Sequence, residues 1–173
     1  MKHFTKLLWL FLVIVGAFLP SVAEASKADV DKYLQDGGIF RIKNRGSNRY
    51  MTLNASNGNL TGRDIIGARP NALTQIWVVK GAAGTYSIRS AFDGRYVPAK
   101  EGNPMQAVRA VTPLYMKYSA ANSGTSTSYV TISWKSDFSD RNCLNENNGS
   151  HNILGWYANS PSVNDAFSDW VLE

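Results

Sequence analysis

Thr74-Gln75-Ile76-Trp77-Val78-Val79 is the stretch that decides the fold, because two weaker copies of it recur along the chain. The second copy is Pro113-Leu114-Tyr115-Met116-Lys117, and the third is Ser168-Asp169-Trp170-Val171-Leu172. Each copy closes a segment that opens with an alternating strand, and the three opening strands end at equivalent isoleucines: Ile42, Ile88 and Ile132. These isoleucines are 46 and 44 residues apart. A fixed period of this size indicates one supersecondary unit that is used three times.

Three repeats of about 45 residues limit the architecture. A propeller needs at least four blades, and an open solenoid needs capping repeats, which the sequence does not show. We therefore predict an all-β fold in which three four-stranded units close into a pseudo-threefold barrel. The expected domain covers residues 38–173, with repeats at about 38–81 (repeat one), 82–124 (repeat two) and 125–173 (repeat three). The closing aromatics recur once per repeat and are predicted to fill a shared core: Trp77, Tyr115 and Trp170.

Residues 1–25 have the pattern of an export signal. Two lysines precede an apolar run of 13 residues, Leu7 to Leu19, and Ala23-Glu24-Ala25 supplies small residues at the cleavage positions. The run is shorter than the roughly 20 residues that cross a bilayer, although an uncleaved anchor is the alternative. We expect cleavage near Ala25, a secreted or periplasmic mature protein, and no membrane span in that form. Residues 26–37 are predicted to form a short helix ahead of the barrel.

The composition is that of a folded, mildly basic domain. Hydrophobic residues make up 44% of the chain and charged residues 18%, which is typical of a globular protein. The net charge is +5, and the basic residues are scattered without a run of five or more, so we expect no nucleic-acid partner. The single cysteine, Cys143, excludes an internal disulfide and is expected to be a small buried hydrophobe. We expect a monomer.

Gln75-Ile76-Trp77 resembles the Gln-x-Trp signature of the ricin B-type β-trefoil lectin family. The second strands of repeats one and two, Arg49-Tyr50 and Arg95-Tyr96, are also similar to that family, and the resemblance covers residues 38–173. It implies a β-trefoil that binds carbohydrate without catalysis, in a shallow pocket on a repeat, and that needs no cofactor and no metal. The expected partner is a glycan or glycoconjugate.

The resemblance also implies where a sugar would bind. The family's acidic position corresponds to Thr52, Pro98 and Asn145 in the three repeats, and its stacking aromatic falls near Arg63 in repeat one and is missing in repeat two. In repeat three the stacking position holds two adjacent aromatics with polar residues after them. The implied site is therefore in repeat three and consists of Asn145, Trp156, Tyr157, Asn159 and Asp165. A flat apolar surface beside amide and carboxylate groups suits the C–H face and hydroxyls of a sugar.

Other functions stay open. A protein-binding or inhibitor module on the same fold is the main alternative, because trefoil loops suit that use as well. Enzyme activity would need a paired acid or a nucleophile with a base, and His151 is the single histidine of the expected mature chain. Candidate acids gather in repeat three: Asp137, Asp140, Glu146, Asp165 and Asp169. Repeat one is basic and could face a sulfated or acidic glycan through Arg41, Lys43, Arg45, Arg49, Arg63 and Arg69.

Overall fold

The computed structural model describes residues 37–82, 84–119, 128–138, 142–157 and 165–173, without the side chains of Ala82, Trp156 and Tyr157. The predicted signal segment and the predicted helix over 26–37 lie outside the described residues. The strands are β1 Gly38–Phe40, β2 Ile42–Asn44, β3 Tyr50–Leu53, β4 Leu60–Arg63, β5 Trp77–Ala82, β6 Thr85–Ser90, β7 Leu114–Tyr118, β8 Val130–Ser133, β9 Cys143–Asn145, β10 Leu154–Tyr157 and β11 Asp169–Leu172. Among the described residues, three short 3₁₀ helices accompany them: η1 Asn71–Gln75, η3 Asn147–Gly149 and η4 Ala166–Ser168.

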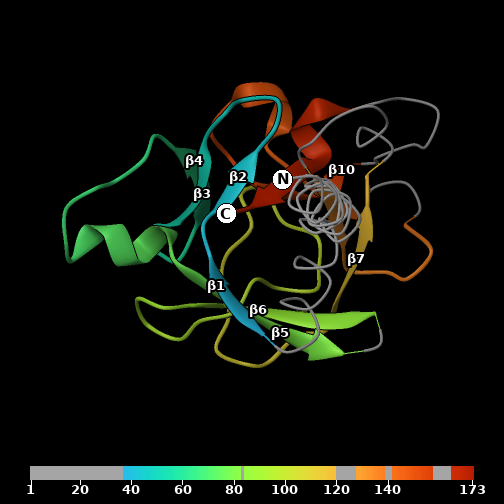
Figure 1. Ribbon diagram of the computed structural model, residues 1–173, viewed down its shortest axis with the longest axis horizontal. Helices are drawn as coiled ribbons and strands as arrows, with labels where there is room; N and C mark the ends of the chain where they lie inside the picture. Colours follow the sequence, from blue (N-terminus) through green and yellow to red (C-terminus); the bar gives the residue numbers. More distant parts are fainter. Residues whose placement is uncertain (1–36, 83, 120–127, 139–141, 158–164) are drawn as a thin grey trace, which may run out of the picture.

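The antiparallel sheet curls until it returns to its first strand (Figure 1). Neighbouring strands follow the order β1, β5, β6, β7, β8, β11 and β2. β1 and β2 follow one another along residues 38–44. At one end of this segment β1 pairs with β5, and at the other end β2 pairs with β11. Arg41, between the two strands, exchanges backbone hydrogen bonds with Glu173: its N–H donates to the Glu173 carbonyl at 2.7 Å and its carbonyl accepts at 3.0 Å. The segment 38–44 therefore closes the barrel.

Three buried residues, one from each predicted repeat, form a ring of backbone hydrogen bonds. The N–H of Leu60 donates to the carbonyl of Met105 at 2.8 Å, Met105 donates to Ile153 at 2.8 Å, and Ile153 donates back to Leu60 at 3.1 Å. The three residues are at most 1% exposed. Buried backbone N–H and C=O groups need hydrogen-bond partners, and here each repeat supplies the partner for a buried backbone group of another repeat. This ring has the threefold arrangement that the repeat period predicts.

The core confirms two of the three predicted aromatic positions. Trp77 and Trp170 are both 0% exposed and belong to one hydrophobic cluster with the apolar residues of the barrel strands. Cys143 is fully buried, as the sequence predicts. No helix among the residues described here combines the length and the apolar character needed to cross a membrane.

The third predicted aromatic, Tyr115, is wrong by one residue. Trp77 pairs with Phe40 of the opening strand of repeat one. Tyr86 is the residue of repeat two that matches Phe40, and it pairs with Leu114. Leu114 is 2% exposed, whereas Tyr115 is only half-buried. Neighbouring residues on a strand point to opposite faces, so a shift of one position exchanges the core for the surface. Leu114 therefore takes the place of the tryptophan in repeat two.

Candidate functional site

Gln75 lies fully buried beneath a loop of repeat one and ties that loop to β3. Its Nε2 donates to the Thr52 hydroxyl and to the Asp64 carbonyl, both at 2.9 Å, and its Oε1 accepts from the Ile66 N–H at 2.8 Å. The side chain can make these contacts because η1 ends at Gln75 directly beside the loop. The amide therefore sets the position of residues 64–66.

A pocket of about 730 Å³ opens over this loop, within the range of small-molecule sites. Ile65 is 57% exposed and supplies an apolar surface in it. Most of the other lining groups are polar, and two of them, Arg63 and Asp64, carry opposite charges. The lining residues are Thr52, Leu53, Asn54, Ala55, Thr61, Arg63, Asp64, Ile65, Ile66, Asn71 and Thr74. An apolar surface surrounded by hydroxyl, amide and charged groups is the arrangement that a sugar requires.

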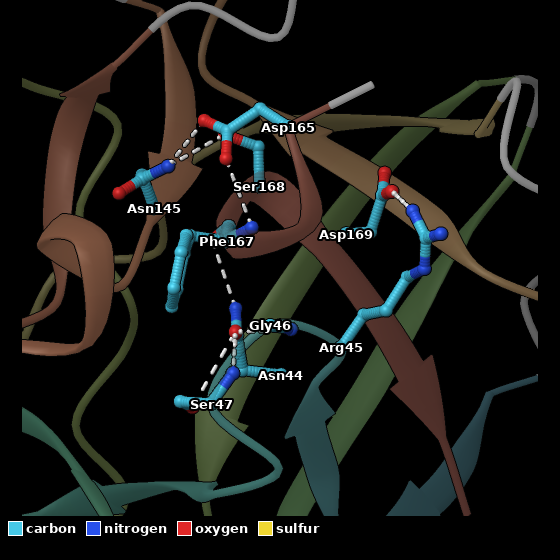
Figure 2. A network of polar contacts seen from close by, with 9 residues as sticks. All are labelled: Asn44, Arg45, Gly46, Ser47, Asn145, Asp165, Phe167, Ser168 and Asp169. Atoms are coloured by element: carbon cyan, nitrogen blue, oxygen red, sulfur yellow. Dashed lines mark hydrogen bonds and ion pairs between the residues drawn. The ribbon is translucent and has the colours of Figure 1, made fainter.

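The equivalent place in repeat three holds a packed polar network instead (Figure 2). Asn145 is 0% exposed, and its Nδ2 donates to Asp165 Oδ2 and to Ser168 Oγ, each at 2.8 Å. Asp165 Oδ1 accepts from the Phe167 N–H at 2.9 Å and so caps η4. The Oδ1 of Asn145 is buried, and no described residue donates to it. The structure thus brings two of the predicted site residues, Asn145 and Asp165, into direct contact.

The other predicted site residues are described only in part. Trp156 and Tyr157 lie on β10, which pairs with β9 so that Tyr157 is opposite Cys143, but their side chains lie outside the description. Asn159 lies outside the described residues altogether. The role of these five residues in ligand binding stays a prediction.

Glu146 follows Asn145 and is buried between repeats three and one. The Ser47 hydroxyl donates to its Oε2, and Arg49 Nη1 lies 3.6 Å from its Oε1. Burial away from water raises the pKa of the Glu146 carboxyl above its ordinary value of 4.5, and the Ser47 hydrogen bond and the Arg49 charge oppose that rise. The carboxyl also lies directly over Gly62, where a Cβ atom would collide with Oε1. Glu146 therefore joins two repeats and lines no part of the repeat-one pocket.

The remaining contacts in Figure 2 connect β2 with η4 and β11. Asn44 donates from Nδ2 to the Phe167 carbonyl at 2.8 Å, and its Oδ1 accepts from the N–H groups of the following turn. Arg45 pairs with the buried Asp169 at 3.0 Å. Three acids that the sequence suggests as catalytic candidates have structural partners: Glu146, Asp165 and Asp169. Within the described ranges, no group of three or more His, Cys, Asp or Glu side chains is placed to hold a metal ion.

Known structures share this fold at low sequence identity. A ricin B-like lectin from Macrolepiota procera, solved in complex with lactose, matches with a TM-score of 0.62 and 15% identity over 80% of this chain and 96% of that one. The designed threefold-symmetric protein ThreeFoil matches with a TM-score of 0.56 and 14% identity over 78% and 96%. The Rhizoctonia solani agglutinin matches with a TM-score of 0.55 and 19% identity over 79% and 94%. The chain is therefore an all-β protein with the β-trefoil fold, and its structural neighbours include ricin B-like lectins.

Sequence comparison adds no family assignment. No protein-family model matches the chain. No curated protein sequence matches it either.

The sequence does not predict the repeat-one pocket, because no aromatic residue is among its lining residues. Ile65 stands ten residues before Gln75, in an Arg63-Asp64-Ile65-Ile66 segment that combines both charges with two branched apolar residues. That mixture close to an intact Gln-x-Trp was the available signal. The backbone contacts of Gln75, which place the segment over the floor of the pocket, could not be deduced from spacing.

Proposed function

We propose that this protein is a lectin-like, non-catalytic carbohydrate-binding module, and that it works outside the cytoplasm after cleavage near Ala25. The observation that carries the proposal is the 730 Å³ pocket of repeat one, which combines exposed apolar surface with convergent polar groups. The export pattern of residues 1–25 supports the location.

The pocket offers each kind of contact that a saccharide needs. Ile65 can pack against the C–H face of a sugar ring. The Asn71 amide can accept or donate hydrogen bonds to the sugar hydroxyls, and the Asp64 carboxylate can accept them. Gln75 holds the loop from below, so the loop loses little conformational freedom when a ligand binds. The pocket therefore favours recognition of a small polar ring with one apolar face.

Repeat three remains a second proposed site, formed by Asn145, Trp156, Tyr157, Asn159 and Asp165. Its support is the pairing of β10 with β9, which brings the Trp156–Tyr157 backbone beside the strand that carries Asn145. Because Asn145 is buried and donates to Asp165, we propose that it positions the acid rather than touching the sugar.

A glycan array on the mature protein tests the proposal, and two exposed apolar residues provide a matched pair of variants. Ile65→Ser removes the apolar surface of the pocket, whereas Val111→Ser makes a similar change at a residue that is 66% exposed and does not line it. We expect Ile65→Ser to weaken binding about tenfold, equivalent to ~1.4 kcal/mol, and Val111→Ser to leave it unchanged.

Trp156→Ala reports separately on repeat three. A loss with Trp156→Ala alone would move the site to that repeat and contradict the repeat-one assignment. The absence of binding to any glycan would reject the function, and a protein partner captured without competition by glycans would support the protein-binding alternative.

A further inference from the structure

The repeat-one pocket contains a basic side chain whose position is set by strand geometry. Arg63 ends β4 and pairs with Tyr50 of β3, and Thr61, two residues earlier, pairs with Thr52. Alternate residues of a strand share a face, so Thr61 and Arg63 both point to the pocket side, and both line the pocket. The residue between them, Gly62, faces the buried carboxyl of Glu146. Arg63 therefore belongs to the wall of the pocket.

Arg63 differs from Lys43, Arg45 and Arg49 of repeat one because its side chain has no protein partner among the described residues. Arg45 pairs with Asp169 at 3.0 Å, and Arg49 lies 3.6 Å from Glu146. The Lys43 ammonium stands 5.4 Å from the centre of the Tyr50 ring. The Arg63 side chain is exposed and makes no ion pair or hydrogen bond with the described part of the chain. Its five N–H donors are thus available to a ligand in the pocket.

We infer that the ligand of this pocket is a saccharide that carries an acidic group, and that Arg63 binds that group. This inference rests on the proposed carbohydrate-binding function. The planar guanidinium matches carboxylate and sulfate oxygens with two parallel hydrogen bonds, which a neutral hydroxyl cannot provide. Asp64, the next residue, is a hydrogen-bond acceptor when ionised and suits a ligand that also carries hydroxyl donors. An acidic sugar has both kinds of group, and uronic acids, sialic acids and sulfated sugars share this chemistry.

The test compares neutral glycans with sulfated, sialylated and uronic-acid glycans built on the same core, first on an array and then by titration calorimetry. We expect at least one acidic class to bind about tenfold or more tightly than its neutral counterpart in 50 mM salt, and this advantage to shrink in 500 mM salt because salt screens the charge. The three acidic classes on the array distinguish which group is bound.

Arg63→Gln is expected to remove the preference, so that the acidic glycan binds no more tightly than its neutral counterpart. Arg109→Gln, which changes the net charge equally at an exposed residue of repeat two outside the pocket, is the matched control and is expected to keep the preference. Equal or tighter binding of neutral glycans, or a preference that survives Arg63→Gln, would overturn the inference and leave the proposed function intact. Failure of every glycan to bind would overturn both.

Discussion

Repeats one and three hold the closing tryptophan with the same hydrogen bond, from the indole N–H to a buried backbone carbonyl. We call this shared arrangement the frame. Trp77 donates its indole hydrogen bond to the Met51 carbonyl at 2.9 Å, and Trp170 donates to the Leu144 carbonyl at 3.1 Å. Each acceptor lies 26 residues before its tryptophan. The frame therefore survives although the two repeats differ in sequence almost everywhere else.

The two repeats differ in the polar pair beside that frame. In repeat one the long side chain is Gln75 and the short one is Thr52, whereas in repeat three the short one is Ser168 and the long one is Asn145; each pair is 23 residues apart. Gln75 has contacts left for the loop 64–66 and so supports the wall of a pocket. In repeat three the pair closes on Asp165 instead. The same frame thus supports a pocket or a packed network, depending on which partner carries the longer side chain.

Repeat two shows a third solution. Val97 corresponds to Met51, since each lies nine residues after the isoleucine of its opening strand, and its carbonyl accepts a hydrogen bond from the Thr112 hydroxyl at 2.5 Å. The Leu114 side chain, in the place of the tryptophan, has no hydrogen-bond donor. The hydroxyl of Thr112, two residues earlier, therefore donates to the Val97 carbonyl. The next residue is Pro98, which offers no side-chain polar group. The acceptor carbonyl is thus satisfied in all three repeats, although the donor changes.

The largest expected effect tests whether the two tryptophans are equivalent. Trp77→Ala and Trp170→Ala each empty a fully buried site and leave a carbonyl without its donor, so each should lower the free energy of unfolding by ~3–5 kcal/mol. Urea unfolding followed by circular dichroism measures the loss. If either variant fails to fold, the corresponding Trp→Phe change keeps most of the volume and tests the indole hydrogen bond alone. A marked difference between the two sites would contradict a common frame.

An intermediate effect is expected when the polar pair of each repeat is broken. Gln75→Met keeps the length of the side chain but leaves the Ile66 N–H and the Asp64 carbonyl without partners, and should cost about 2 kcal/mol. Ser168→Ala should cost about 1 kcal/mol, because Asn145 still donates to Asp165. Gln75→Met should also weaken glycan binding, as measured by calorimetry. A smaller cost for Gln75→Met than for Ser168→Ala would show that Gln75 does not hold the loop.

The repeat period predicted the fold, whereas the site depends on contacts that spacing does not contain. Three in-step isoleucines and two buried tryptophans were sufficient for the barrel, because a shared core needs the same residue type at the same position of each repeat. Tyr115 was assigned to the core because it is the aromatic residue nearest to the position of the two tryptophans. The strand register places Leu114 at that position instead. The partners of Gln75 are loop backbone atoms, which no residue pattern identifies. Burial of Glu146 likewise arises from packing between two repeats.

The smallest expected effect concerns this contact between the repeats. Glu146 from repeat three is buried against Ser47, Arg49 and Gly62 of repeat one, and the cost of its burial is partly offset by Ser47 and Arg49. Its pKa is raised in the folded state, so the folded protein favours the protonated carboxyl more than the unfolded chain does. This contribution of Glu146 to the free energy of unfolding is fully present below the pKa that the carboxyl has in the unfolded chain. It is lost as the pH rises through the pKa that the carboxyl has in the folded protein. The wild-type protein should therefore lose stability relative to Glu146→Gln as the pH rises above about 4.5.

Urea unfolding of the two proteins between about pH 4 and pH 8 measures this difference, and most other titrating groups cancel in the comparison. Arg49 and His151 are the charged or titratable neighbours that act on the carboxyl, and both lower its pKa. The comparison is therefore repeated in the His151→Ala background, which removes the effect of His151 on the Glu146 carboxyl. Glu101→Gln makes the same change of charge at an exposed residue and serves as the control. A difference that is independent of pH would mean that Ser47 and Arg49 balance the effect of burial on the pKa of Glu146. A difference that grows in favour of the wild type as the pH rises would mean that they outweigh burial and that the two repeats are joined by an ion pair.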